Sequence, residues 1–160
     1  MTEDTKALSQ FKSLKIIYVA VVASTVMFSL AVLAITYVQL MENQPSETSL
    51  GNLSYLALIT VALSIPLSLF IYKSQLKSVR GKKLDLSGKL KQYATAMITQ
   101  AAVIEGSVIL TCVAVLIEGQ PIILFSIPIV LFMLFLNRPT LFRLENDLQL
   151  SREELEILTP

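Results

Sequence analysis

Glu105 is the residue of this chain whose position most demands a chemical explanation. It lies at the midpoint of residues 93–117, which hold no other charged side chain. An ionised carboxyl at the centre of a bilayer costs at least about 2.5 to 3.5 kcal/mol. Protonation, a hydrogen-bond partner on a facing helix or a water-filled path must offset that cost. The carboxyl is therefore a relay for protons or cations in transport, a structural acid that clasps two helices, or a group whose counter-ion a partner protein supplies.

Polar side chains at helical spacing supply candidate partners for this carboxyl. On a helical wheel Glu105 shares a stripe with the small residues Ala94, Ala101 and Cys112, along which another helix can approach closely. The candidate intramembrane polar site comprises Glu105, Gln100, Ser107 and Thr111, with Ser29 from residues 16–40 and Ser64 and Ser68 from residues 53–72; Thr25, Thr36 and Thr60 lie on the same polar faces. Each hydroxyl has the alternative of bonding within its own helix. Because polar and small residues occupy several faces of residues 93–117, we expect a central helix without a wide lipid-facing side.

Residue types for catalysis are poorly supplied. The chain contains no His, the commonest metal ligand and the usual acid/base group near neutral pH. Its single cysteine, Cys112, excludes an intrachain disulfide, and no Gly-rich phosphate loop or Cys/His cluster occurs. We therefore expect no catalytic residue, no metal site and no cofactor.

Two prolines lie inside apolar runs and are candidate kinks. Pro66 and Pro128 each remove one backbone hydrogen bond from a helix. Broken helices that expose carbonyl groups can build transporter sites at mid-membrane, although single prolines are tolerated in membrane spans.

Four long apolar runs must position these residues. Hydrophobic residues make up 54% of the 160 residues and charged residues 16%, against roughly 45 to 50% and 25% in soluble domains. The runs cover residues 16–40, 53–72, 93–117 and 121–136, and a helix needs roughly 20 residues to cross a bilayer. Only residues 118–120 separate the last two runs. We expect one all-α membrane domain over residues 1–160, with four spans paired as two antiparallel hairpins.

The basic residues indicate an orientation for this bundle. All 13 Lys and Arg residues fall within residues 1–15, 73–92 and 137–160. Short loops rich in Lys and Arg remain in the cytoplasm, so both termini and residues 73–92 are expected there. The net charge of only +1 argues against a nucleic-acid partner.

The predicted cytoplasmic pieces carry signals of local order. Leu8, Phe11 and Leu14 recur beside lysines, which suits a short interfacial helix that continues into the first span. A turn is expected at residues 80–83. Ser151 and Glu154 form a Ser-x-x-Glu capping box that predicts a short final helix.

Three motifs in the C-terminal half suggest a family. The sequences Ala102-Val-Ile-Glu-Gly106, Asn137-Arg-Pro-Thr140 and Asp147-Leu-Gln-Leu-Ser151 resemble those of a group of small bacterial four-span membrane proteins with no established activity. The resemblance begins at about residue 93. It implies a location in the bacterial inner membrane and nothing about a substrate.

The preferred interpretation is a structural or accessory membrane component without catalysis. Its small and polar stripes would pack against a second copy or an unidentified membrane protein within the lipid bilayer. The alternative is a subunit of a proton- or cation-coupled transporter or channel, in which Glu105 is the intramembrane relay.

Overall fold

The chain folds into helices in a computed structural model that describes residues 3–42, 51–80 and 84–158. No strand occurs in these ranges. The elements are α1 (Glu3–Glu42), α2 (Asn52–Arg80), α3 (Leu86–Glu118), the 3₁₀ helix η1 (Pro121–Phe125), α4 (Ser126–Leu136), α5 (Leu141–Leu148) and α6 (Arg152–Leu158). Residues 81–83 of the turn predicted at residues 80–83, and most of the connection before α2, lie outside the described residues.

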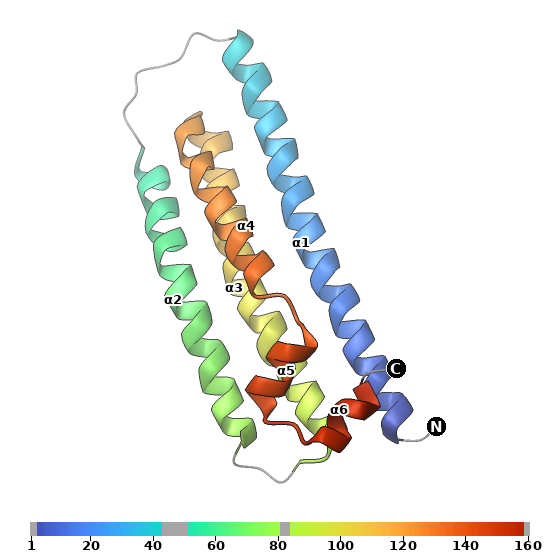
Figure 1. The fold of residues 1–160 in the computed structure, drawn as a ribbon. Helices are drawn as coiled ribbons and strands as arrows, with labels where there is room; N and C mark the ends of the chain where they lie inside the picture. Colours follow the sequence, from blue (N-terminus) through green and yellow to red (C-terminus); the bar gives the residue numbers. More distant parts are fainter. Residues whose placement is uncertain (1–2, 43–50, 81–83, 159–160) are drawn as a thin grey trace.

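Successive long helices run in opposite directions along one bundle (Figure 1). The first and third helices, α1 and α3, run the same way, while α2 and α4 return. The short helices α5 and α6 lie at the end of the bundle where α1 begins. The first and last of the described residues therefore lie at this end of the molecule.

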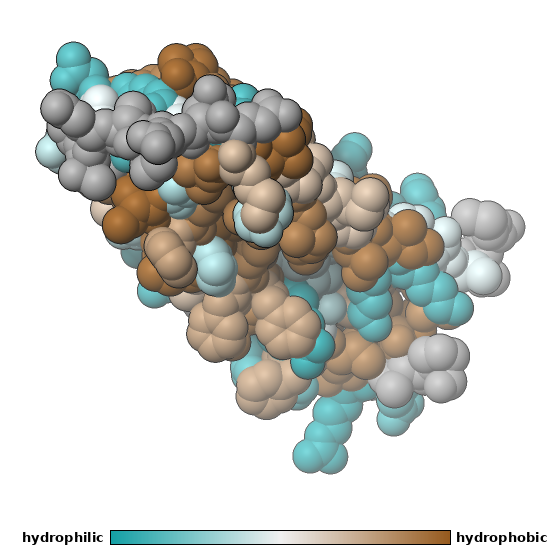
Figure 2. All heavy atoms as spheres, turned by 90° about the horizontal axis from the view of Figure 1, so that it is seen from above, coloured by the Kyte–Doolittle hydropathy of each residue, from teal (hydrophilic) through white to brown (hydrophobic). Residues whose placement is uncertain are grey.

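Three helices, α1, α2 and α3, are long and apolar enough to cross a membrane. A fourth candidate meets the same criteria of length and composition when η1–α4 and α5, which bend by 72° relative to each other, are counted together. On the face that Figure 2 shows, hydrophobic residues predominate along the bundle, and hydrophilic residues lie mainly toward its two ends. These are the features of a multi-pass membrane protein.

Helix α3 is the most buried of the long helices. Half of its most apolar 18-residue stretch is buried, against 28% for α2 and 17% for α1. One face nevertheless remains exposed, formed by Ala102, Gly106, Ile109 and Val113. The expectation that α3 is a central helix is met. The expectation that it has no wide exposed face is wrong, because α1, α2 and α4 leave this side of α3 uncovered.

Helix α1 continues unbroken from its amphipathic start into its apolar part. Its buried residues recur at spacings of three or four, with one spacing of seven, and they are Ala7, Phe11, Leu14, Tyr18, Thr25, Ser29, Val32 and Thr36. Such a spacing keeps one seam of a helix against a neighbour over many turns. Leu8, which the sequence predicted on this face, is only half-buried, and the preceding residue, Ala7, is the buried one.

The two prolines have different local consequences. Pro66 lies inside α2, which remains helical on both sides of it. Pro128 is the third residue of α4 and follows the 3₁₀ turn of η1. Because Pro128 has no N–H to donate to the Leu124 carbonyl, the turn before it can tighten to 3₁₀ geometry.

The final helices are capped by side chains. Thr140 Oγ1 accepts a hydrogen bond from the Arg143 backbone N–H at 3.2 Å, which starts α5. Before α6, the Ser151 N–H donates to Glu154 Oε2 at 2.9 Å, and the Glu154 N–H donates to Ser151 Oγ at 3.2 Å. These reciprocal bonds are those that a capping box provides.

Candidate functional site

Glu105 lies half-buried between α1 and α3. Its Oε1 atom is 3.2 Å from the Thr25 hydroxyl and 3.4 Å from the Ser24 hydroxyl, both on α1. Each hydroxyl is also 2.8 Å from the Val21 carbonyl. A hydroxyl has one proton to donate but two acceptor lone pairs. An ionised Glu105 can accept from these hydroxyls, and a protonated Glu105 can donate to one while that hydroxyl donates to Val21, so both protonation states can join the helices.

The other predicted hydroxyls do not reach Glu105. Each donates instead to a carbonyl three or four residues earlier in its own helix, at 2.7 to 2.9 Å; the residues are Ser29, Ser64, Ser68, Ser107 and Thr111. They are buried and small, and they allow neighbouring helices to approach. Of the polar residues singled out from the sequence, the structure brings only Thr25 to Glu105.

Gln100 belongs to a different polar cluster, near the end of the bundle where the chain termini lie. It is 1% exposed, and its Oε1 atom accepts a hydrogen bond from Arg143 Nη2 at 3.4 Å. Its Nε2 atom is buried without a hydrogen-bond acceptor among the described residues. Gln100 therefore positions α5 against α3 and does not contribute to the site around Glu105.

Arg143 is the centre of this second cluster, which the sequence did not indicate. Its guanidinium carbon lies 4.7 Å from the ring centroid of Tyr72, and Nε is 3.4 Å from Asp147. The Tyr72 hydroxyl donates to the same carboxylate, and its ring meets that of Tyr93 edge-on. Only the i, i+4 spacing of Arg143 and Asp147 after the Thr140 cap could have suggested an ordered polar face.

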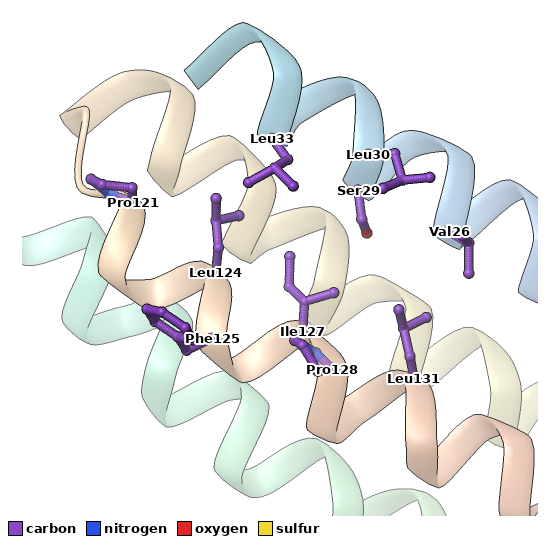
Figure 3. Close-up of a pocket in the computed structure, with 10 residues that line it drawn as sticks. All are labelled: Val26, Ser29, Leu30, Leu33, Pro121, Leu124, Phe125, Ile127, Pro128 and Leu131. Carbon is purple, nitrogen blue, oxygen red and sulfur yellow. The ribbon is translucent and has the colours of Figure 1, made fainter. Parts of the chain in front are cut away.

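Two grooves lie alongside α1. The apolar groove, about 420 Å³ in volume, separates α1 from η1 and α4 and is lined by Leu30, Leu33, Phe125, Pro128 and Leu131 among others (Figure 3). The second, which we call the lysine groove, lies between the starts of α1 and α3 and has a volume of about 560 Å³. Lys6 and Lys91 line it together with polar and apolar residues of both helices.

The described residues contain no cluster of three or more His, Cys, Asp or Glu side chains that could hold a metal ion. Comparison of the chain with protein-family models, with curated proteins and with solved structures finds no match. Function must therefore be argued from the geometry of the side chains.

Proposed function

We propose that this protein is a structural or accessory component of a bacterial inner membrane, in which the Glu105 carboxyl holds α1 against α3. The observation that carries the proposal is the 3.2 Å contact between Glu105 and Thr25. In lipid, a polar side chain gains most from a partner on a neighbouring helix because water is absent. A clasp of this kind needs no cavity and no catalytic partner.

The proposed topology has four spans with both termini in the cytoplasm. Its support is that residues 3–15, 84–92 and 137–158 lie at one end of the bundle (Figure 1), and these stretches contain most of the basic residues. The fourth span would be η1–α4. Its five 3₁₀ residues and 11 α-helical residues rise about 26 Å together, a little less than the hydrocarbon core of about 30 Å, and small mismatches of this size are accommodated by the bilayer.

The exposed face of α3 is the proposed contact with a second copy or another membrane protein. Ala102 and Gly106 form a small-x-x-x-small pair there, and a Cβ added at Gly106 would have no described atom within 4 Å apart from its chain neighbours and its own helix backbone. Such pairs let two helix backbones approach closely in lipid. Gly106→Leu should therefore reduce self-association measured by cross-linking in native membranes. The control is Ile109→Leu, which changes a residue on the same face without changing its side-chain volume.

The clasp is tested by two substitutions with different hydrogen-bonding ability. Glu105→Gln keeps an acceptor for Thr25, so the free energy of unfolding in detergent should change little. Glu105→Leu removes it and should lower that free energy by about 0.6 to 1.7 kcal/mol. Equal stability of all three proteins would reject the clasp.

The alternative function is proton- or cation-coupled transport with Glu105 as the relay. It is favoured by the lysine groove, which lies between the same two helices and reaches Ile17 and Ile98, seven residues before Ser24 and Glu105. This separation is about 10 Å along a helix. For a relay, Glu105→Gln should abolish proton flux into proteoliposomes under an imposed membrane potential, and unchanged flux would reject it.

A further inference from the structure

The lysine groove changes from polar to apolar along its length. Because α1 and α3 run in the same direction, residue numbers on both walls rise together from the end of the bundle toward its middle (Figure 1). The outer part is lined by Lys6, Ser9, Gln10, Ser13, Asp85, Ser87 and Lys91. The inner part is lined by Leu14, Ile17, Ala94 and Ile98, and the buried Leu90 lies next to Lys91 where the two parts meet. This order matches an amphiphile with a polar head outside and a hydrocarbon tail inside.

Two exposed lysines give the outer part a positive charge. Within the described residues, Lys6 and Lys91 form no ion pair, whereas the nearby Lys89 is bound to Glu154 at 2.6 Å. Among the described residues, Asp85 is the one acidic residue that lines the groove, so the described lining has a net positive charge from its two lysines. The groove is thus complementary to a single anionic group.

We propose that the lysine groove binds one anionic phospholipid of the surrounding membrane. Lys6 and Lys91 would hold the phosphate, with the Ser9 and Ser13 hydroxyls as additional donors, and an acyl chain would lie along Ile17 and Ile98. Basic pockets between helices on the cytoplasmic side of a membrane bind such headgroups. The inference rests on the proposed membrane placement, which puts residues 16 and 93 at the start of the hydrocarbon region.

The apolar groove is an internal comparison for this site. It lies on another side of α1 and is lined by residues such as Leu30 and Phe125, and none of the described residues that line it is charged (Figure 3). A lipid chain there would gain nothing from an anionic headgroup. Selection for anionic lipid should therefore depend on the lysine groove alone.

The test uses the full chain in detergent, mixed with equal amounts of phosphatidylglycerol and phosphatidylcholine, and counts bound lipids by native mass spectrometry. The unmodified protein should retain one phosphatidylglycerol in preference to phosphatidylcholine. Combined Lys6→Ala and Lys91→Ala should weaken that binding by about 30-fold, since each lysine near a charged lipid surface contributes about fivefold. The matched control, Lys12→Ala with Lys73→Ala, removes the same charge from exposed positions outside the groove and should leave binding unchanged.

A second variant tests the tail. Ala94→Phe would fill the inner groove without changing any charge, and it too should reduce phosphatidylglycerol binding. The proposal would be overturned if the Lys6/Lys91 variant and the Lys12/Lys73 control lost phosphatidylglycerol binding equally. It would also be overturned if the unmodified protein bound the two lipids equally. Displacement of the lipid by millimolar inorganic phosphate would also overturn it, because the site would then be one for a free anion. If the protein is folded and extracted from membranes, each of these outcomes refutes the lipid site but not the proposed location in a membrane. A chain that does not fractionate with membranes would refute that location.

Discussion

The carboxylate of Glu118, the last residue of α3, accepts a hydrogen bond from the backbone N–H of Leu53 at 2.8 Å. It also accepts one from the N–H of Ser54 at 2.9 Å. Both donors belong to the first turn of α2, whose N–H groups have no partner within their own helix. A carboxylate at a helix N-terminus is favoured by the helix dipole as well. The end of one helix thus caps the start of its antiparallel neighbour, a role for which α2 has no acidic residue of its own in its first turn.

Glu118→Ala should loosen the start of α2 while leaving the rest of the bundle intact. Amide hydrogen exchange at Leu53 and Ser54 should accelerate, because their N–H groups lose an acceptor. Gly51→Ala should have a similar effect, since its new Cβ would lie 2.3 Å from the Glu118 carboxyl carbon and displace the side chain. The increases in amide exchange caused by Glu118→Ala and Gly51→Ala should not be additive in the double variant. The control is Glu156→Ala, which removes an exposed acid on α6. Equal exchange rates of the Leu53 and Ser54 amides in this variant and in Glu118→Ala would contradict the cap.

The contact between Thr25 and Glu105 should appear as a coupling free energy in a double-mutant cycle. Thr25→Val and Glu105→Leu each break the same hydrogen bond, so their combined effect on unfolding should be smaller than the sum by about 0.6 kcal/mol. Ser29→Ala is the matched control because the Ser29 hydroxyl donates to its own helix. Additivity in the Thr25 cycle would mean that the helices are held together without this bond.

Removal of Arg143 should release α5 from the bundle. Its guanidinium pairs with Asp147 and also contacts Gln100 and Tyr72, so Arg143→Ala should cost about 1 to 3 kcal/mol in thermal unfolding. Arg143→Lys should recover only part of this, since an ammonium cannot reproduce the planar guanidinium contacts. Protease cleavage within α5 measures the release. Arg152→Ala, at an exposed position, should not change it, and cleavage that is equally fast in both variants would refute the role of Arg143.

The sequence was informative where a residue's environment follows from its own helix and less so where it depends on a neighbour. The length and polarity of residues 16–40, 53–72 and 93–117 were enough to predict three helices that could cross a membrane, because the bilayer sets a minimum length. A single charge in such a run was enough to single out Glu105. The hydrogen-bond partner of Glu105 was harder to predict, since Thr25 and Ser29 lie one turn apart on the same face of α1. Which of them meets the carboxyl depends on the axial offset between α1 and α3.

The Arg143 cluster and the Glu118 cap were missed for a related reason. The Arg143–Gln100 contact and the capping of the Leu53 N–H by Glu118 each join groups more than 40 residues apart. Apart from the i, i+4 spacing of Arg143 and Asp147, neither arrangement leaves a pattern within one segment. Pairing of the helices brings these residues together. By contrast, the capping box at Ser151 could be predicted because its two residues lie within one helical turn.

The attachment of α6 to α3 should weaken in acid. Partial burial raises the pKa of Glu154, but the Lys89 ammonium and the Ser151 N–H and hydroxyl outweigh it and hold that pKa below its ordinary value of 4.5. A carboxyl whose pKa is lower in the folded state contributes stability that is complete above the unfolded value and is lost as the pH falls through the folded one. We expect a loss of about 0.2 to 1 kcal/mol for this partly exposed pair, seen as faster hydrogen exchange in α6 below pH 4.5.

Glu154→Gln separates this pair from other acid effects. The variant cannot be ionised, so hydrogen exchange in α6 should already be fast at neutral pH and should change less between pH 6 and pH 3 than in the unmodified protein. Lys89→Ala should raise the pH at which α6 loosens, because it removes the ammonium that lowers the Glu154 pKa. Glu153→Gln changes an exposed acid of the same helix and should behave like the unmodified chain. If all three variants loosened with the same pH dependence, attachment of α6 would depend on its apolar contacts, such as that of the buried Leu158, and not on the ion pair.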